Sequence, residues 1–257
     1  MDSRSPLARQ RIVSDRAQFL TRGDYAHRGL HGPETGLTEN SLPAFSAALI
    51  AGFGAECDVR LSADGIAYVF HDATLERLTG ATGPFSARTA AELDTMALID
   101  NGGPIPRLSA LLALMAGQKP LLIEIKIDGV EPVGPLCAAV ARDLLDYTGP
   151  AAIMSFDPRV SRWFAAHAPD VARGLVVTEE NEKGWWGKCK RTLAVLHARP
   201  DFLAYDIRDL PSPFAARARL ENRPVLSWTV RRPEHWQTVR QHADAAIFEG
   251  AALPRNG

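Results

Sequence analysis

Charged side chains recur at every second position in two short hydrophobic runs of the sequence. Glu56 and Asp58 flank Cys57 in the first run, and Glu124 and Lys126 are likewise two apart in the second. In a β-strand, residues two apart project from the same face, so each pair would share one side of its strand. Buried charges of this kind are costly unless they are paired or bound to a metal ion. Cys57, on the opposite face, is expected to be a small core residue.

The three acidic residues together offer only oxygen ligands. Glu56, Asp58 and Glu124 therefore suit a hard divalent cation, Mg²⁺ or Ca²⁺, with water or substrate oxygens completing its shell. The alternative is a salt-bridge network in which Lys126 neutralises one carboxylate. Because one lysine cannot balance three carboxylates, we expect these three residues to be metal ligands, with Mg²⁺ or Ca²⁺ as the cofactor.

Two histidines end strand-like runs and could move protons. His27 is followed by Arg28 and Gly29, and His71 is followed by Asp72. Histidine is the side chain best suited to give and take protons near neutral pH, so both are candidates for general acid and base. The planar guanidinium of Arg28 fits phosphate oxygens, and Gly29 would let the backbone come close. Asp72 could orient the His71 ring or, equally, cap the segment that follows.

These residues belong to a regular alternation of short β-rich runs and longer helical patterns. Such an alternation predicts βαβ units and a parallel sheet. The run Ile66–Phe70 follows the second strand after a link that contains Asp64-Gly65 and is too short for a parallel crossover, so we interpret it as the return arm of a hairpin. The remaining predicted strands are Tyr25–Arg28, Ala55–Leu61, Leu121–Ile127, Ala151–Ser155, Arg173–Val177, Phe202–Asp206, Val225–Val230 and Asp244–Phe248.

Eight strands that alternate with helices predict an α/β fold, the (β/α)8 or TIM barrel, and 257 residues match the ~250 that this fold typically needs. We expect one domain over residues 1–257, with a small insertion at about residues 72–106, after the second strand. A connection of that length is usually functional or forms a small subdomain. Active sites of such barrels lie at the C-terminal ends of the strands. The predicted helices include Ser41–Ala51, Glu131–Tyr147, Pro158–Ala168 and Pro233–Gln241.

A series of short motifs runs in order through residues 25–250. The motifs are His27-Arg28-Gly29, Glu39-Asn40-Ser41, Ala44-Phe45, Glu56-Cys57-Asp58-Val59-Arg60, Asp64-Gly65, Val69-Phe70-His71-Asp72, Leu75-x-Arg77-Leu78-Thr79, Ile105-Pro106 with Leu108, Glu124-Ile125-Lys126, Ser155-Phe156 and Trp228-Thr229-Val230. In order and spacing they resemble the glycerophosphodiester phosphodiesterase family. The resemblance implies metal-dependent hydrolysis of glycerophosphodiesters to glycerol 3-phosphate and an alcohol, on a barrel with an insertion after its second strand.

The resemblance also implies a role for each candidate residue. The implied roles are metal binding by Glu56, Asp58 and Glu124, general acid and base catalysis by His27 and His71, and phosphate contact by Arg28 and Lys126. Glu39 would lie beside the metal cluster. Trp228, at the end of the seventh strand, would line the glycerol pocket, or else be a core aromatic that closes the barrel.

The last strand departs from the family pattern. It ends in Ile247-Phe248-Glu249-Gly250, where relatives usually have Thr-Asp followed by Pro. The missing Asp puts a supporting role at this edge in doubt, and we assign no function to Glu249 from the sequence. A second departure, Thr38 in place of a Pro, should change only a loop.

Two other functions remain open. The segment of residues 183–191, with adjacent Trp185 and Trp186 among several cations, could contact lipid, as in a phosphodiesterase that acts on lysophospholipids in the manner of a lysophospholipase D. We instead expect it to begin a helix with buried tryptophans and solvated lysines. A non-catalytic phosphoester-binding protein is the third possibility, but the candidate acids, histidines and cations are all present.

Composition limits the partners and the compartment. The formal net charge of -1 gives no global attraction to nucleic acid, so we expect a small-molecule partner, a glycerophosphodiester. Three cysteines without a CxxC pair fit a reduced compartment. Without an apolar run of signal-peptide or membrane-span length, we expect a cytoplasmic protein. The oligomeric state and the preferred headgroup are not predicted.

Overall fold

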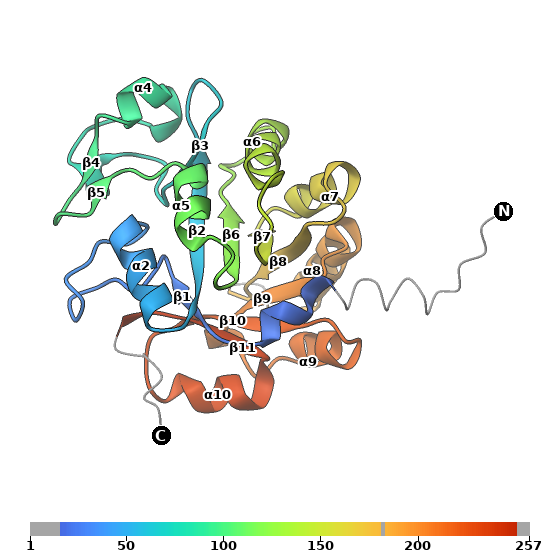
Figure 1. The fold of residues 1–257 in the computed structure, drawn as a ribbon. Coiled ribbons are helices and arrows are strands. Elements are labelled where there is room, and N and C mark those ends of the chain that lie inside the picture. The colour runs from blue at the N-terminus through green and yellow to red at the C-terminus, as the bar shows by residue number, and fades with distance from the viewer. Residues whose placement is uncertain (1–15, 181–182, 251–257) are drawn as a thin grey trace.

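A closed barrel of parallel strands forms the centre of the computed structural model, which describes residues 16–180 and 183–250 (Figure 1). The barrel closes because β1 pairs in parallel with both β2 and β11. Its eight strands are β1 (Tyr25–His27), β2 (Gly54–Leu61), β6 (Leu121–Ile125), β7 (Ala151–Ser155), β8 (Ala172–Val177), β9 (Phe202–Asp206), β10 (Val225–Val230) and β11 (Ala245–Phe248). The predicted TIM barrel and each of its predicted strands are confirmed, with small differences at the strand ends.

Helices lie around the outside of the barrel, between successive strands (Figure 1). Local sequence explains where some of them begin: the hydroxyl of Ser41 accepts a hydrogen bond from the Ala44 amide at the start of α2, and Asp157 caps α7 ahead of Pro158. The main helices of this layer are α2 (Leu42–Ile50), α5 (Leu108–Met115), α6 (Gly134–Leu144), α7 (Pro158–His167), α8 (Trp185–Ala198), α9 (Pro213–Leu220) and α10 (His235–His242).

The strands alternate between two apolar layers, as the period of two requires. In β6, Ile123 packs outward against the helices, together with Cys57, whereas Leu122 packs inside the barrel. At the N-terminal ends of the strands, the barrel interior is a packed core, and the side chain of Tyr25 fills the space there. A Cβ on Gly54 would lie 2.8 Å from the Tyr25 ring, so only glycine fits there. This packing leaves the upper end of the barrel, at the C-terminal ends of the strands, for polar side chains.

The predicted hairpin and insertion are both present. β3 (Ala67–Val69) pairs antiparallel with β2. The following residues form a small subdomain whose apolar cluster includes Phe70, Phe85 and Leu93, with Phe70 and Phe85 stacked at 4.8 Å between ring centroids. Its short elements are α3 (Glu76–Thr79), η2 (Phe85–Ala87), α4 (Ala90–Leu93), β4 (Ala97–Leu98) and β5 (Gly103–Pro104). Within the described part of the chain, no helix is long and apolar enough to cross a membrane.

Candidate active site

Three buried carboxylates meet at the C-terminal end of the barrel. Glu56 and Asp58 come from β2 and Glu124 from β6, where Asp58 and Glu124 are direct partners in the parallel register. One oxygen from each residue lies within 4.8 Å of those of the other two. Asn40 holds Asp58 in place, because its side-chain amide donates to Asp58 Oδ2 at 2.9 Å. The shared inward face that the sequence predicted for these residues therefore exists.

Two cations lie against these acids, and both contact Asp58. Lys126 Nζ lies 2.8 Å from Asp58 Oδ1 and 2.5 Å from Glu124 Oε1. Arg28 Nε lies 3.0 Å from Asp58 Oδ2, and the Arg28 backbone amide donates to Glu56 Oε2 at 3.1 Å. Lys126 and Arg28 thus neutralise one side of the cluster, whereas among the described residues the hydrogen bond to Glu56 comes from the backbone amide of Arg28.

The electrostatics of the cluster fit a further positive charge beside Glu56. Burial raises the pKa of Glu56 well above its ordinary value, and the charges of Asp58 and Glu124 raise it further. Burial also raises the pKa of Glu124. Asp58 is the exception: burial opposes its ionisation, but Lys126 and Arg28 outweigh burial and hold its pKa far below the ordinary value.

An unpaired oxygen points to the same conclusion. Glu56 is fully buried, and its Oε1 has no hydrogen-bond partner within the described residues. A buried carboxylate oxygen without a partner is costly, and a divalent cation shared with Asp58 and Glu124 would remove that cost. The residues present therefore fit the divalent metal that the sequence predicts.

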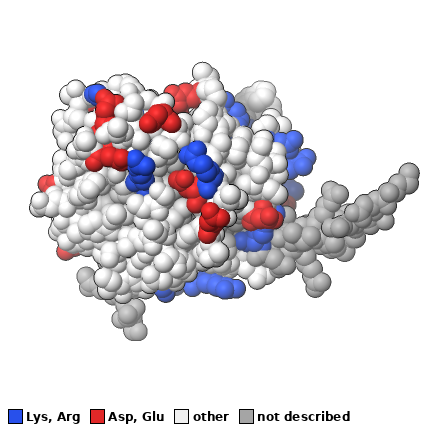
Figure 2. Space-filling model, turned by 45° about the horizontal axis from the view of Figure 1, so that its top comes forward, with Lys and Arg blue, Asp and Glu red and all other residues white. Residues whose placement is uncertain are grey.

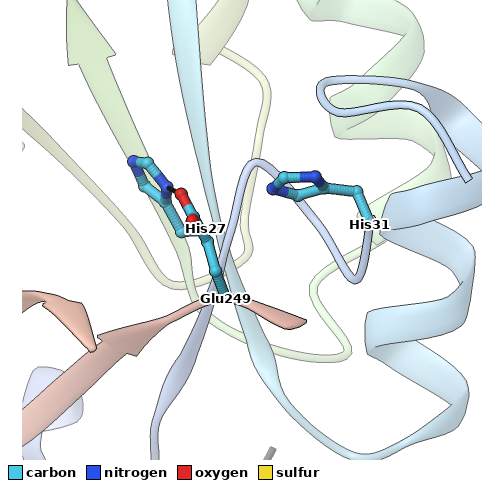
Figure 3. Close-up of side chains that lie close together, drawn as sticks. All are labelled: His27, His31 and Glu249. Carbon is cyan, nitrogen blue, oxygen red and sulfur yellow. Dashed lines mark hydrogen bonds and ion pairs between the residues drawn. The ribbon is translucent and has the colours of Figure 1, made fainter. Parts of the chain in front are cut away.

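His27 lies beside the carboxylate cluster, and its ring is held by Glu249, which follows the last barrel strand. Its Nδ1 lies 2.5 Å from Glu249 Oε1, and its Nε2 lies 3.7 Å from Glu56 Oε2. Arg231 in turn donates to both oxygens of Glu249, at 2.6 and 3.1 Å. Figure 3 shows His27 and Glu249 side by side, with the ring of His31 across from them on the loop that follows β1. No role for Glu249 is predicted from the sequence, but the structure places its carboxylate against a candidate catalytic residue.

The electrostatics of this pair favour a proton on His27 Nδ1. Burial lowers the pKa of His27, and the hydrogen bond with Glu249 opposes that shift. Burial would raise the pKa of Glu249, but His27 and Arg231 hold it well below the ordinary value, so Glu249 is ionised. A carboxylate can only accept, so Nδ1 of His27 donates and Nε2 faces the carboxylate cluster.

His71 is held in the same manner on the other side of the site. Its Nδ1 lies 2.7 Å from Asp72 Oδ1, and burial lowers its pKa. Of the two possibilities left open for Asp72, the contact with His71 is the one observed, since the residue that precedes α3 as its cap is Leu75. Hydrogen bonds from Arg77 and His71 lower the pKa of Asp72 to about 2.

Arg77 connects Asp72, the partner of His71, with Glu39, the partner of Arg28. Its guanidinium donates to both oxygens of Asp72, at 2.6 and 2.8 Å, and to both oxygens of Glu39, at 2.8 Å each. Glu39 also accepts from Arg28 Nη1 at 2.7 Å. Glu39 therefore contacts Arg28, which in turn contacts Asp58. It is not a member of the three-carboxylate cluster.

Tight backbone geometry positions Arg28. Its φ is +55°, and Gly29 follows with a φ of +80°. A Cβ on Gly29 would lie 2.7 Å from the backbone carbon of Ala44 in α2. From the sequence, Gly29 was expected to let the backbone come close to a phosphate. In the structure, its missing side chain lets this turn pack on α2.

Trp228 lies between the barrel core and the mouth. Its Nε1 donates to the Ala204 carbonyl at 2.9 Å, and its ring packs against the interior cluster. Its other neighbour is Phe156, edge to face at 5.4 Å between ring centroids, and Phe156 is 48% exposed. Trp228 is thus only partly buried, with the contacts of a core aromatic on one hand and the partly exposed Phe156 as a neighbour on the other.

Acidic and basic side chains lie next to one another over much of the charged surface on the face shown in Figure 2, and most of that face is uncharged. This arrangement agrees with the formal net charge of -1. Positive charge at the site is therefore local, from Arg28 and Lys126 beside the carboxylates, and not part of a broad positive field.

Comparison with known proteins relates this geometry to one family. The family model described as glycerophosphoryl diester phosphodiesterase family matches residues 27–249. A phosphodiesterase from Oleispira antarctica, solved with the product sn-glycerol-3-phosphate, is 23% identical, with a TM-score of 0.76 over 90% of this chain and 94% of that one. A glycerophosphodiester phosphodiesterase from Thermotoga maritima is 26% identical, with a TM-score of 0.70 over 88% of this chain and 94% of that one. A search of curated proteins found no match.

Proposed function

This chain belongs to the glycerophosphoryl diester phosphodiesterase family and is a phosphoric diester hydrolase, and from that premise we propose that it hydrolyses glycerophosphodiesters to glycerol 3-phosphate and an alcohol, with a divalent metal and two catalytic histidines. The observation that carries the proposal is the buried set of Glu56, Asp58 and Glu124, in which Glu56 Oε1 lacks a partner among the described residues. The product bound in the Oleispira antarctica relative supports the substrate class.

Glu56, Asp58 and Glu124 would hold the metal, which we propose to be Mg²⁺ or Ca²⁺. When bound, such an ion offsets negative charge that develops on the phosphate. Arg28 and Lys126, which already border the cluster, would contact the phosphate oxygens from the protein side. Because Arg28 and Lys126 both form ion pairs with Asp58, a movement of the Asp58 carboxylate would displace both cations together.

The two histidines would carry the protons. Each has its Nδ1 against a carboxylate, so each presents Nε2 for reaction. In the first step, one histidine takes the proton of the glycerol 2-hydroxyl as its oxygen bonds to phosphorus, and the other donates a proton to the leaving alcohol oxygen. Water then opens the cyclic phosphate: the histidine that gave its proton takes one from water, and its partner returns one to the 2-hydroxyl oxygen. The sum consumes one water molecule and leaves both histidines as they began.

Trp228 and Phe156 would form the apolar wall for the glycerol carbons, since the two rings pack edge to face and Phe156 is partly exposed beside the mouth. Glu39 and Asp72 would support the site through Arg28 and His71, respectively.

Product analysis tests this proposal. The protein is incubated with glycerophosphocholine, glycerophosphoethanolamine and a panel of lysophospholipids, with Mg²⁺, Ca²⁺ or EDTA, beside a Glu56→Ala variant. We expect metal-dependent release of glycerol 3-phosphate from the glycerophosphodiesters and none from the variant. Cleavage of the lysophospholipids alone would replace the proposal with a lysophospholipase D-like activity, and binding without cleavage of either class would indicate a phosphoester-binding protein.

A further inference from the structure

The outward face of α8 carries an unusual set of exposed apolar side chains. Trp185 and Trp186 are 63% and 70% exposed, and Leu193 and Leu196 are 66% and 65% exposed. The expectation that the two tryptophans would be buried is therefore wrong. Soluble proteins rarely leave several large apolar side chains exposed together unless the surface binds something.

These side chains form one stripe and are not scattered. Trp186, Leu193 and Leu196 are spaced so that they share a face of the helix, with the exposed Cys189 between them. The rings of Trp185 and Trp186 stack at 3.8 Å between centroids at the first turn of the helix. The opposite face is anchored on the barrel, since Arg191 is buried and pairs with Glu179 at 3.1 Å. The helix is thus fixed in place with its apolar stripe directed outward.

Within its own segment of the chain, the stripe is flanked by cations. From Lys183 to Pro200 the sequence contains no Asp or Glu, and its exposed cations are Lys183, Lys188, Lys190 and Arg199. A helix with Trp and Leu on one face and Lys or Arg beside it is suited to lie in the interface of an anionic lipid bilayer, and tryptophan is enriched at membrane interfaces. A second copy of this chain on the same face would bring like charges together, which argues against self-association.

The first turn of α8 lies near the end of the barrel that holds the candidate site. Trp185 begins α8 shortly after β8 ends at Val177, so the first turn of the helix is on the side of the C-terminal strand ends. Glu56, Asp58 and Glu124 lie at this same end. Docking through the first turn would therefore bring the mouth close to the surface that the helix contacts.

We propose that the outward face of α8 docks this protein on an anionic lipid surface, through the Trp185–Trp186 pair and the leucines of the stripe, with Lys188 and Lys190 attracted to the lipid phosphates. This interaction is separate from catalysis: it needs no metal and no residue of the carboxylate cluster. It would concentrate the enzyme at membranes, where deacylation of phospholipids must supply glycerophosphodiesters.

Co-sedimentation with lipid vesicles tests the proposal on the full chain. We expect the protein to pellet with vesicles of phosphatidylglycerol and phosphatidylcholine at low salt, to be released at high salt, and not to pellet with pure phosphatidylcholine. The double variant Trp185→Ser/Trp186→Ser should lose at least about tenfold in partitioning. Lys188→Gln/Lys190→Gln should lose about 25-fold, since each cation near an anionic surface contributes roughly fivefold.

A matched control removes exposed apolar side chains elsewhere. Ile50 in α2 and the residue after α6, Leu145, are 86% and 81% exposed, and Ile50→Ser/Leu145→Ser should bind vesicles as the wild type does. Circular dichroism and the hydrolysis of soluble glycerophosphocholine, unchanged in all three double variants, would show that fold and active site are intact. Vesicle binding by the wild type that the tryptophan substitutions do not weaken would overturn the proposal. So would a wild-type dimer in sedimentation velocity that these substitutions dissociate, because a second copy would then occupy the stripe.

Discussion

Glu249 accepts a hydrogen bond from Nδ1 of His27 at 2.5 Å, across 222 positions of sequence. The pair joins the last barrel strand to the first, next to the point where the barrel closes. Asp72 holds the Nδ1 of His71 in the same way at 2.7 Å. Each candidate catalytic histidine therefore has one ring nitrogen fixed by a carboxylate and the other available to substrate, an arrangement that selects a single tautomer.

Glu249→Gln should lower kcat by roughly 10–10²-fold with little change in KM, because an amide can donate to Nδ1 and favour the wrong tautomer of His27. Glu249→Asp keeps the charge and should retain more activity than Glu249→Gln. Steady-state kinetics on glycerophosphocholine checks both. Glu234→Gln, at an exposed ion pair with Arg232, is the matched control and should behave as the wild type does. Equal losses in the Gln and Asp variants would count against a tautomer-selecting role.

His27→Ala and His71→Ala should each lower turnover by roughly 10²–10⁴-fold, because each removes a proton carrier. Single-turnover rates of glycerol 3-phosphate release measure the loss without a contribution from product dissociation. His167→Ala, at the exposed end of α7 where the ring bonds to the Trp163 carbonyl, should leave the rate unchanged. Wild-type turnover in either site variant would remove that histidine from the mechanism.

Arg77→Lys should lower activity by about tenfold, because a lysine cannot bond both carboxylates at once as the guanidinium does. Glu39 and Asp72 would lose their common partner, and with it the fixed orientation of Arg28 and His71. Kinetics on glycerophosphocholine gives the measurement, with Arg88→Lys in the surface pair with Glu92 as the control. If the two lysine variants were equally active, the link through Arg77 would have no part in catalysis.

Gly29→Ala should destabilise the protein by roughly 2–4 kcal/mol, from a left-handed backbone and a Cβ that lies 2.7 Å from the Ala44 backbone. Gly36→Ala has a similar φ of +65° but open space around its Cβ, and it should cost only about 1 kcal/mol. Urea unfolding of both variants separates the backbone contribution from the packing contribution. Equal losses would show that the packing of Gly29 on α2 adds nothing.

Much of the carboxylate cluster could be predicted from the sequence because it depends on local periodicity. Glu56 and Asp58 share a face since they are two apart on one strand, and Glu124 joins them because adjacent parallel strands align their C-terminal ends. The hairpin at Ile66–Phe70 followed similarly from a short link that allows no other connection. These inferences needed only strand geometry and the eight-strand count.

The contacts that sequence reasoning did not find depend on the closed barrel or on neighbouring helices. Glu249 meets His27 only because β11 pairs with β1, and strand periodicity cannot give that register. The exposure of Trp185 and Trp186 depends on what packs over α8, which helical spacing alone does not determine. The packing of Gly29 against Ala44 depends on the path of α2, which the residues around Gly29 do not determine.

Metal binding that depends on Glu56 can be measured directly. Metal-stripped protein is titrated with Mg²⁺ and with Ca²⁺ by calorimetry, and the release of glycerol 3-phosphate is followed at each addition, for the wild type, Glu56→Gln and the exposed-site control Glu131→Gln. We expect one bound ion to restore activity in the wild type and in the control, with at least about tenfold weaker binding and little activity in Glu56→Gln. Full activity of the stripped wild type, or unchanged metal binding in Glu56→Gln, would contradict this expectation.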